Sequence, residues 1–593
     1  MRLGGSPQEL ETGRGATITS FSSAGLTAYG HKIKPDLAAP GGQILSATTK
    51  RSGGPFAPFD GTSMATPHVA GLAALLVERH PWWSPRQVKS ALVSTAGPAW
   101  GDTARTVEAP VPLQGGGLAN VDAADDPRLF TDPVSLSFGD LDVNGGAARS
   151  PLLLAVADAG GGAGTWTVEL RPQSQPAGSS IEVSSTVTLS PGAESFLPVV
   201  ARASGAAAAG DAYGFLVLRN GSVERRVPYA FLVTRPGLAG APVRPIRFIQ
   251  TGDTRQGVSR AQAYRYPAAP FGPAPDYASP AVVEPGSETL YSVVVSEPIA
   301  NFGAAVIAGS GSALVHPWVL GSKDENDVQG YAATPVNVNN LTLDFPLDIG
   351  AAAAVFPTSK TYYVAVDSGR DPFTGRSLGG SYVLRSWMND VTPPLVGLVT
   401  GRVAAGRPTI AVRALDEGAG VDPYSLVLSY GGALVGATAY DPASGIAIFP
   451  LPKQAPALKV GKRRLNVGAS DFQEAKNVDS IGDSIMPNTT YAAGPIRVVD
   501  RPTVTWLAPE PRECLAARAS LTVVASATRK LRSVRFLDGR QPIATTKRGV
   551  DGLFQAIWRT GGAAKGRHRL RAIVTDASGR KAEARRDVRI CRR

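Results

Sequence analysis

The sequence predicts a multidomain protein in which a partial α/β layer fold is followed by a string of all-β sandwich domains. The chain has 593 residues, and at roughly 150 residues per domain this length suggests about four domains. Alternating strand, loop and helix patterns occur between about residues 33 and 97. From about Asp126 onward, short alternating strands are separated by turns that contain glycine and proline, a pattern typical of β-sandwiches. The 66 glycines and 48 prolines of the whole chain also favour many turns and short strands.

Composition excludes two classes of protein. Apolar residues make up 43% and charged residues 18% of the chain, so it is globular rather than disordered. The densest apolar run, Val69 to Val77, is half the length of the roughly 18 residues that cross a bilayer, and we expect no membrane span. The first residues of the chain, MRLGGSPQELETGRG, lack an apolar core and a cleavage signature, so no signal peptide is expected.

The α/β region is predicted to lie within residues 1–126. Turn-forming residues at 33–41 lead into a short strand at about 44–47. A helix is predicted from Gly61 to about His80, where Pro81 ends it. Because this helix is apolar on every side from Val69 to Val77, we expect it to be buried.

A second helix is predicted to begin after Ser84. Ser84 is a good N-cap, Pro85 suits the first helical position, and Gln87 is placed to complete a capping box. The helical repeat i, i+3, i+4, i+7 is carried by Val88, Ala91, Leu92 and Thr95. Gly97 and Pro98 then end the helix.

Four β-sandwich blocks are predicted downstream. They are a fibronectin III-like block at 127–237, a further sandwich at 238–392, an Ig-like block at 395–499 and a basic Ig-like block at 500–593. Residues 461–471 of the third block align with residues 566–576 of the fourth, at an offset of 105 residues. Such an internal repeat has the size of one sandwich domain.

The last block carries the excess positive charge and both cysteines. Residues 501–593 contain 22 Lys and Arg residues and 7 Asp and Glu residues. Their net charge of +15 exceeds the net charge of +12 of the whole chain. This surface is either a solvated basic face or a site for an anionic polymer. Cys514 and Cys591 lie near the two ends of the block. They form either a disulfide, in an oxidising compartment, or two buried thiols.

Ser63 is the first candidate for chemistry. The segment Gly61-Thr62-Ser63-Met64-Ala65 places it at the amino end of the first predicted helix. Free backbone N–H groups and the helix dipole there favour developing negative charge, which suits an acyl-transfer nucleophile. A serine before a helix is more often an ordinary cap, so position alone leaves both interpretations open.

The surrounding motif resembles a known family. Gly-Thr-Ser-Met-Ala-Thr-Pro-His-Val-Ala-Gly at 61–71 resembles the active-serine motif of subtilisin-like serine proteases, the subtilases or peptidase S8 family. Segments 20–25 and 34–41 resemble what precedes that serine in the family, and 115–121 resembles the turn and strand that close the catalytic domain. The β-rich remainder is similar, more loosely, to the accessory domains of large secreted subtilases.

The resemblance implies that residues 1–126 are the carboxy-terminal portion of a doubly wound subtilisin-like catalytic domain, with Ser63 as nucleophile. The implied activity is hydrolysis of peptide bonds in a protein or peptide substrate through an acyl-enzyme. It also implies an extracellular, secreted protein. Subtilases often bind calcium, so calcium is an implied cofactor, but the sequence identifies no site for it.

The sequence departs from the family in what precedes the serine. The family's aspartate, histidine and oxyanion asparagine lie far upstream, whereas only 62 residues precede Ser63, without Asp-Thr/Ser-Gly or His-Gly-Thr-His motifs. We therefore expect an amino-terminally truncated endopeptidase that is inactive alone, unless a separately encoded amino-terminal half complements it. The alternative is a non-catalytic extracellular binding or adhesion protein built of β-sandwiches.

The chain has five histidines that could replace the missing base: His31, His68, His80, His316 and His568. His68 follows Ser63 by five positions, about 140° round the helix, so its ring should not reach the hydroxyl. His31 lies in a loop that could approach the serine, and His80 suits a helix C-terminus. The other two are expected to be structural.

Metal-site signals in the sequence are weak. Asp324, Glu325, Asn326 and Asp327 could ligate calcium, but their spacing is not that of an EF-hand, and a solvated loop is the favoured interpretation. Asp471 and Asp576 each follow a predicted strand and are interpreted as turn starters.

Overall fold

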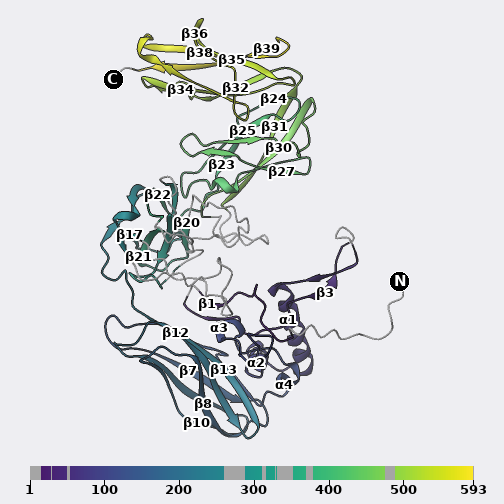
Figure 1. Cartoon of the computed structure of the whole chain (residues 1–593), viewed down its shortest axis with the longest axis vertical. Coiled ribbons are helices and arrows are strands. Elements are labelled where there is room, and N and C mark those ends of the chain that lie inside the picture. The colour runs from purple at the N-terminus through teal and green to yellow at the C-terminus, as the bar shows by residue number, and fades with distance from the viewer. Residues whose placement is uncertain are drawn as a thin grey trace.

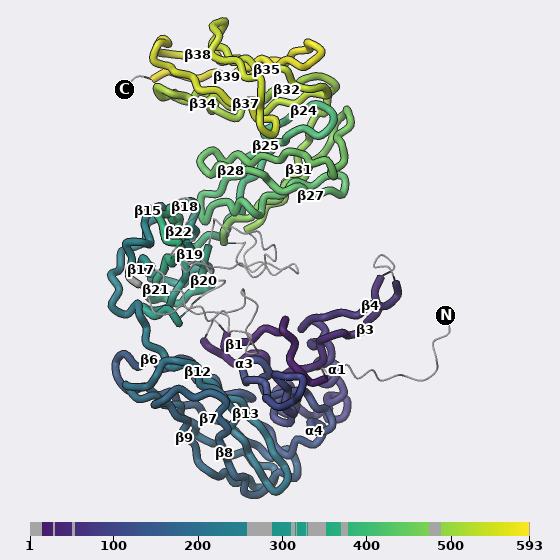
Figure 2. Tube along the Cα trace, in the orientation of Figure 1, coloured from purple at the N-terminus to yellow at the C-terminus, as the bar shows by residue number. Residues whose placement is uncertain are grey.

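The computed structural model describes residues 15–27, 30–49, 54–259, 287–309, 315–327, 329, 351–368, 378–473 and 488–591. Four β-sandwiches follow one another along the long axis, and the helical region lies beside the first of them (Figure 1). The Cα trace runs in chain order from this helical region to the fourth sandwich at the opposite end (Figure 2). Among the described residues, no helix is long and apolar enough to cross a membrane.

The α/β region contains four helices and two small sheets in its described part. The elements are β1 (Gly25–Leu26), β2 (Ile33–Lys34), β3 (Ile44–Ala47), β4 (Phe56–Phe59), α1 (Thr62–Arg79), α2 (Pro85–Ser94), α3 (Val111–Gln114) and α4 (Val121–Asp125). The predicted strand at 44–47 and both predicted helices are confirmed. The described strands form two antiparallel pairs, β1–β2 and β3–β4, and not the doubly wound sheet that the resemblance implies.

The prediction that helix α1 is buried on every side is wrong. Leu76 is its one buried residue, while Leu75 and Val77 are 51% and 52% exposed. An apolar sequence predicts burial only where other layers cover the helix, and the helices that contact α1 in the described structure are α2 and α4. Helix α1 therefore presents apolar surface that nothing in the described residues covers.

Helix α2 forms as the sequence predicts. The Ser84 side chain accepts a hydrogen bond from the Gln87 N–H, and the Gln87 side chain accepts one from the Ser84 N–H, which completes the capping box. Its buried face packs with Leu76 of α1 and with Phe130 of the first sandwich. Both the local capping box and the long-range apolar contacts thus stabilise helix α2.

The first sandwich has two sheets around a core that includes Trp166. Their strand orders are β10 (Thr186–Leu189), β8 (Gly164–Ser174), β12 (Gly210–Asn220), β13 (Val223–Thr234), β6 (Leu136–Asp142) in one sheet and β5 (Leu129–Asp132), β7 (Ala148–Asp158), β11 (Glu194–Ala203), β9 (Ser179–Val183) in the other. The α/β region packs on the first of these sheets: Leu26, Ile33 and Val111 bury themselves against Phe215 and Val217 of β12.

The second sandwich is described in part. One sheet has the order β14 (Val243–Pro245), β17 (Ser287–Val295), β21 (Lys360–Ser368), β19 (Val315–Leu320), with β16 (Val258–Ser259) paired to β17, and the other has the order β15 (Ile249–Asp253), β22 (Ser381–Met388), β18 (Asn301–Gly309), β20 (Ala351–Val355). One core joins both sheets.

The third and fourth sandwiches are two copies of one topology. The third has the sheets β23 (Leu395–Leu398), β25 (Thr409–Leu415), β29 (Ile446–Pro450), β28 (Ala439–Asp441) and β24 (Arg402–Ala404), β31 (Thr489–Val499), β30 (Gly461–Ser470), β26 (Val427–Tyr430), β27 (Ala433–Gly436). The fourth has β32 (Thr503–Ala508), β34 (Arg518–Ser526), β37 (Leu553–Arg559) and β33 (Cys514–Leu515), β39 (Lys581–Ile590), β38 (Gly566–Asp576), β35 (Leu531–Asp538), β36 (Gln541–Thr546).

The internal repeat found in the sequence corresponds to β30 and β38. Each is the middle strand of a five-stranded sheet, pairs with the following strand as a hairpin, and lies one strand away from a short parallel edge strand. The sheets of all four sandwiches lie within the predicted blocks, and the division of the chain into domains stays a prediction.

Cys514 and Cys591 form a disulfide with a Cα–Cα distance of 5.6 Å, which confirms one of the two alternatives left open by the sequence. The bond joins the edge strand β33 to the end of its parallel partner β39, and it closes a sequence separation of 77 residues. The cross-link reduces the conformational freedom of the unfolded fourth sandwich.

Replacing both cysteines, as in Cys514→Ser with Cys591→Ser, should destabilise the fourth sandwich by about 2–4 kcal/mol, because the unfolded chain regains loop entropy. Hydrogen exchange of β33 and β39 in the full chain measures this change. Exchange in the first sandwich serves as the internal control and should not change. Equal protection of β33 and β39 with and without the bond would contradict the prediction.

Candidate active site

Three segments singled out by the sequence meet in the α/β region. The Gly61 N–H donates to the Gly41 carbonyl at 2.9 Å, which joins the start of α1 to the end of segment 34–41. The Ala38 N–H donates to the Gly117 carbonyl at 2.8 Å, and the Ala119 N–H donates to the Ala38 carbonyl at 2.9 Å. Segment 34–41 thus connects the helix that carries Ser63 to the glycine turn at 115–117.

The glycines of that turn are required by close backbone contacts. Gly115 has a φ of +58°, and a Cβ there would lie 2.3 Å from the carbonyl oxygens of Pro35 and Asp36. Gly117 has a φ of +125°, and its Cβ would lie 2.0 Å from the Gly97 carbonyl oxygen. Only glycine allows both the conformation and the approach.

Ser63 is the second residue of α1, and its side chain is exposed. The first N–H groups of a helix have no acceptor one turn earlier, so the Ser63 N–H points out of the helix end with the positive end of the dipole. Pro67 is the sixth helical residue and, lacking an N–H, cannot donate to the Ser63 carbonyl. The local geometry presents a hydroxyl and a backbone donor together at an open helix end.

A cleft of about 1410 Å³ lies beside this helix end. Small apolar side chains of α1 form one wall, among them Ala65, Val69 and Ala73, while residues 15–22 and 35–43 form the opposite walls. Because these α1 side chains are only partly covered, the cleft exposes the apolar face that the sequence predicts to be buried. The cleft can accommodate a further polypeptide layer or a peptide segment.

Two of the candidate bases turn away from Ser63. The Nδ1 atom of His68 lies 2.8 Å from the Met64 carbonyl oxygen, one turn back on the same helix, which agrees with the prediction that its ring does not reach the Ser63 hydroxyl. His31 is 2% exposed, and its Nε2 atom lies 3.0 Å from the Asn326 carbonyl oxygen in the second sandwich. Burial raises the pKa of nearby Asp211.

Two described histidines pair with aspartates, but at other places. His80 Nε2 lies 2.8 Å from Asp125 Oδ1, and its ring stacks on Trp83 at a centroid distance of 3.8 Å. It lies seventeen positions after Ser63, at the C-cap of α1, which is about 25 Å along the helix axis. His568 lies 2.6 Å from Asp538 in the fourth sandwich. The side chain of His316 is outside the described residues, and none of the four described rings bonds to the serine.

The loop at Asp324–Asp327 is not the solvated loop that the sequence predicts. Glu325 is 2% exposed, and its carboxylate accepts hydrogen bonds from the N–H groups of Gly237 and Leu238. Burial raises the pKa of Asp324 to about 7. The loop packs on the connection between the first two sandwiches, and these carboxylates therefore have a structural role there.

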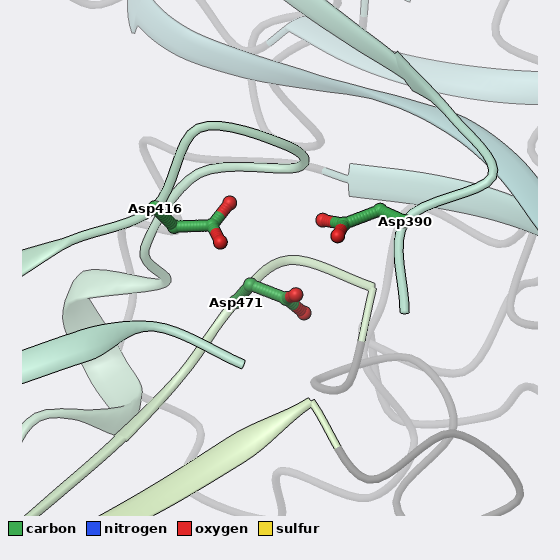
Figure 3. A group of neighbouring side chains, drawn as sticks. All are labelled: Asp390, Asp416 and Asp471. Carbon is green, nitrogen blue, oxygen red and sulfur yellow. The ribbon is translucent and has the colours of Figure 1, made fainter. Parts of the chain in front are cut away.

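A second acidic group was missed by the sequence analysis. Asp390, Asp416 and Asp471 converge at one end of the third sandwich, with one carboxylate oxygen from each lying within 4.8 Å of the other two (Figure 3). The usable signal is positional: Asp416 and Asp471 directly follow β25 and β30, while Asp390 lies in the connection between β22 of the second sandwich and β23 of the third. Turn chemistry explains each such residue alone, and only the topology brings them together.

The comparisons with known proteins concern the α/β region. Residues 11–125 match the model of the family described as "Subtilase family". The chain is 40% identical over 129 residues to the subtilisin-like protease SBT3.4 of Arabidopsis thaliana, covering 20% of this chain and 17% of that protease. It is 43% identical over 126 residues to SBT3.10 of the same plant, covering 19% of this chain and 16% of that protease. Residues 11–125 are thus a subtilase segment, and the chain spans about one sixth of the length of the curated relatives it matches.

Comparison with solved structures found proteins of fibronectin and adhesion type at low TM-scores. Fibronectin(III)-like modules of Clostridium thermocellum CbhA align with 15% of this chain and 94% of that one, at 22% identity and a TM-score of 0.14. A tetra-tandem repeat from the extending region of a large adhesion protein aligns with 77% of this chain and 99% of that one, at 12% identity and a TM-score of 0.13.

Leu75 and Leu76 of α1 provide a matched test of the observed burial. Leu76→Ala should lower the free energy of unfolding of the α/β region by about 2–5 kcal/mol, because it leaves a cavity against α2. Leu75→Ala, on the exposed side, should cost less than about 1 kcal/mol. Hydrogen exchange of α1 and α2 in each variant gives both values. Equal costs would show that α1 is covered on both sides in solution.

Proposed function

We propose that this protein acts as a subtilisin-like serine endopeptidase component in which Ser63 is the nucleophile. The observation that carries the proposal is the convergence of the Ser63 motif, segment 34–41 and the glycine turn on one helix end. The substrate class is a protein or peptide, because the subtilase segment supplies the parts that act on a peptide carbonyl. The family match over residues 11–125 supports this assignment.

The proposed chemistry begins with attack of the Ser63 hydroxyl oxygen on a peptide carbonyl carbon. The carbon becomes tetrahedral, its oxygen takes the negative charge, and the Ser63 N–H at the helix end donates to that oxygen. Expulsion of the amine leaves an acyl-enzyme, which water then hydrolyses to release the acid and the free serine. Both steps require a group that takes the serine proton and later delivers it.

That base must come from polypeptide outside the described residues. The four described histidine rings are bonded elsewhere, two of them to aspartates far from the helix end. We infer that the uncovered wall of α1 and the cleft beside it receive the polypeptide that carries the base. Apolar side chains such as Val69 would then be buried in the assembled enzyme, as the sequence predicts. The amino-terminal half that complements the chain is thus the proposed partner.

The disulfide in the fourth sandwich supports a proposed extracellular location. Structural disulfides persist in oxidising compartments, and those of the cytosol are rare. A secreted protease component would lie in such an oxidising compartment.

The proposed nucleophile is tested by acylation with a fluorophosphonate probe and by casein hydrolysis. The chain alone should react no faster than its Ser63→Ala variant, because loss of the base of a Ser–His pair lowers kcat by about 10⁶. Co-expression with a subtilase amino-terminal half that carries the aspartate and histidine should restore labelling at Ser63.

The control variant is Ser23→Ala, which removes an exposed serine from the same region. It should label like the unmodified complex. Labelling of the chain alone at Ser63 would overturn the claim that it lacks a base. A folded complex that labels at neither serine would overturn the assignment of Ser63.

We also propose that the fourth sandwich holds the protein on an anionic polymer. The exposed face of the β38–β39 hairpin aligns Arg567 with Arg589 and Arg571 with Arg585 across the two strands. Glu583 lies between Arg571 and Arg585, whose hydrogen bonds lower its pKa to about 2, so it stays charged and offsets part of this charge. The excess of 15 positive charges in residues 501–593 supports an attraction that spans the face.

This polymer contact should weaken with salt. Retention of the full chain on heparin should fall as NaCl rises from 0.1 to 1 M, since the Debye length falls from about 10 Å to about 3 Å. Arg567→Glu with Arg589→Glu should shift elution to lower salt, whereas Arg149→Glu with Arg202→Glu, a cross-strand pair in the first sandwich, should shift it much less. Equal shifts would identify a general charge effect rather than a site.

A further inference from the structure

The five-stranded sheet of the third sandwich carries basic residues and no acidic ones. Its strands β24, β31, β30, β26 and β27 contain no Asp or Glu, and their basic residues are Arg402, Lys462, Arg463, Arg464 and Arg497. The third block as a whole is close to neutral, because residues 395–499 contain ten Lys and Arg residues and eight Asp and Glu residues. The fold therefore gathers on one sheet a positive charge that composition does not reveal.

Three of these cations form a row across neighbouring strands of the sheet. Arg402 of β24 lies opposite Arg497 of β31, and Arg497 lies opposite Lys462 of β30. All three are exposed, whereas the next residue of β31, Val498, belongs to the core. With strands about 4.8 Å apart, the row is about 10 Å long on the solvent face of the sheet. We call Arg402, Arg497 and Lys462 the basic row; its strands are neighbours in the third sandwich (Figure 1).

The charge of the basic row is not neutralised within the part of the chain that the structure describes. None of the ion pairs found there involves a member of the row. In the corresponding sheet of the fourth sandwich, by contrast, Arg569 pairs with Asp587 and Arg571 pairs with Glu583. Like charges directly opposite each other on neighbouring strands destabilise a sheet. The row therefore costs the free sandwich stability, and an anion bound along it would remove that cost.

The internal repeat places an equivalent pair of cations in the fourth sandwich. Lys462 corresponds to Arg567 at the repeat offset of 105 residues. Lys462 lies opposite Arg497 in one hairpin, as Arg567 lies opposite Arg589 in the other. Among the described residues, Arg567 and Arg589 form no ion pair either. The same unfavourable juxtaposition thus occurs at one register position in both copies, and binding of an anion there explains what packing of the sheet does not.

We propose that the basic row of the third sandwich binds a sulfated glycan through its sulfate groups. Guanidinium groups bind oxyanions through paired N–H donors, and a lysine adds a point charge. Because the row crosses the strands on an open face, successive sulfate groups of a linear chain can meet successive members of the row. Arg464, exposed two residues along β30 from Lys462, extends the positive charge to one side. The site consists of residues of the third sandwich and does not depend on the function proposed for the β38–β39 face.

The surroundings of the row favour a glycan over a single-stranded nucleic acid. Sites for single-stranded nucleic acid combine cations with aromatic side chains on which the bases stack. The exposed aromatic residue of this sheet is Tyr491, six residues from Arg497 along β31, which is about 20 Å. The disulfide between Cys514 and Cys591 supports an extracellular location, where sulfated glycans are present.

The experiment measures the Kd of the full chain for heparin, a sulfated glycan, at 0.1 M NaCl. Lys462→Gln with Arg497→Gln should raise this Kd at least about tenfold, because fewer cations neutralise the polymer and release its counterions. Adding Arg402→Gln, from the neighbouring strand, should raise it further.

A second readout separates loss of the site from loss of the fold. Lys462→Glu should weaken heparin binding and at the same time slow hydrogen exchange of β24 and β31 in the free protein, because attraction to Arg497 replaces repulsion. Faster exchange of these strands together with weaker binding would show that the sheet was damaged, and the Lys462→Gln and Arg497→Gln variant would then decide.

The matched control is Arg149→Gln with Arg202→Gln, a cross-strand pair of the first sandwich in which Arg202 already pairs with Glu182. It should change the Kd for heparin much less than the substitutions in the basic row. These row substitutions should weaken binding by a similar factor in a chain that also carries Arg567→Glu and Arg589→Glu. The outcome for the third sandwich is thereby separated from the outcome for the fourth.

Two further ligands identify the chemistry that the row recognises. Heparin should bind more tightly than desulfated heparin and more tightly than a single-stranded oligonucleotide with the same number of charges. Tighter binding of the oligonucleotide, or equal binding of desulfated heparin, would overturn the assignment to sulfated glycans. An unchanged Kd for heparin in the Lys462→Gln and Arg497→Gln variant would overturn the site itself, whatever the fourth sandwich binds.

Discussion

Packing of the α/β region on the first β-sandwich is the constraint on which the candidate active site depends. Within residues 15–125 the described sheets are only two antiparallel pairs, too small to enclose a core of their own. The core is instead shared, since Leu26 and Val111 bury themselves on β12 and Leu76 packs with Phe130. The Arg226 side chain lies over Phe215 and pairs with Glu108, which adds a polar link across the same contact. This shared core holds in place the hydrogen bonds that join α1, segment 34–41 and the glycine turn.

The elements that the sequence predicted well are those determined by local physics. The capping box at Ser84 involves residues three apart, and the strand at 44–47 and the bounds of both helices follow from short-range signals. The turn at Asp576 is also local, since its carboxylate accepts from the Ser578 and Arg580 N–H groups. The exposure of α1 could not be predicted this way, because an apolar sequence reports a preference for burial and not the presence of a covering layer. Among the candidate site residues, Ser63 was proposed from its motif and stays a prediction, while the bonding of each described imidazole to a group other than Ser63 could be seen only in the fold.

The acidic group of Asp390, Asp416 and Asp471 was missed because local sequence patterns do not show which distant residues meet. Asp390 and Asp471 are separated by 81 positions, and each has a sufficient local explanation as a residue at the end of a strand. Their convergence follows from the order of strands in two sheets, which no local pattern contains. The internal repeat was visible in the sequence, but the aligned segment 461–471 contains Asp471 alone, so it could not indicate that Asp390 and Asp416 lie nearby.

The two ends of the molecule thus depend on charge in different ways. At the open end of α1, the dipole and free N–H groups would favour the negative charge that develops in the proposed acyl transfer, so an exposed and solvated site costs little when no substrate is bound. In the fourth sandwich, at the other end, the excess positive charge of residues 501–593 is permanent and includes the exposed face of the β38–β39 hairpin. If the fourth sandwich holds a polymer, the second and third sandwiches between the two ends determine how far from that polymer Ser63 can act.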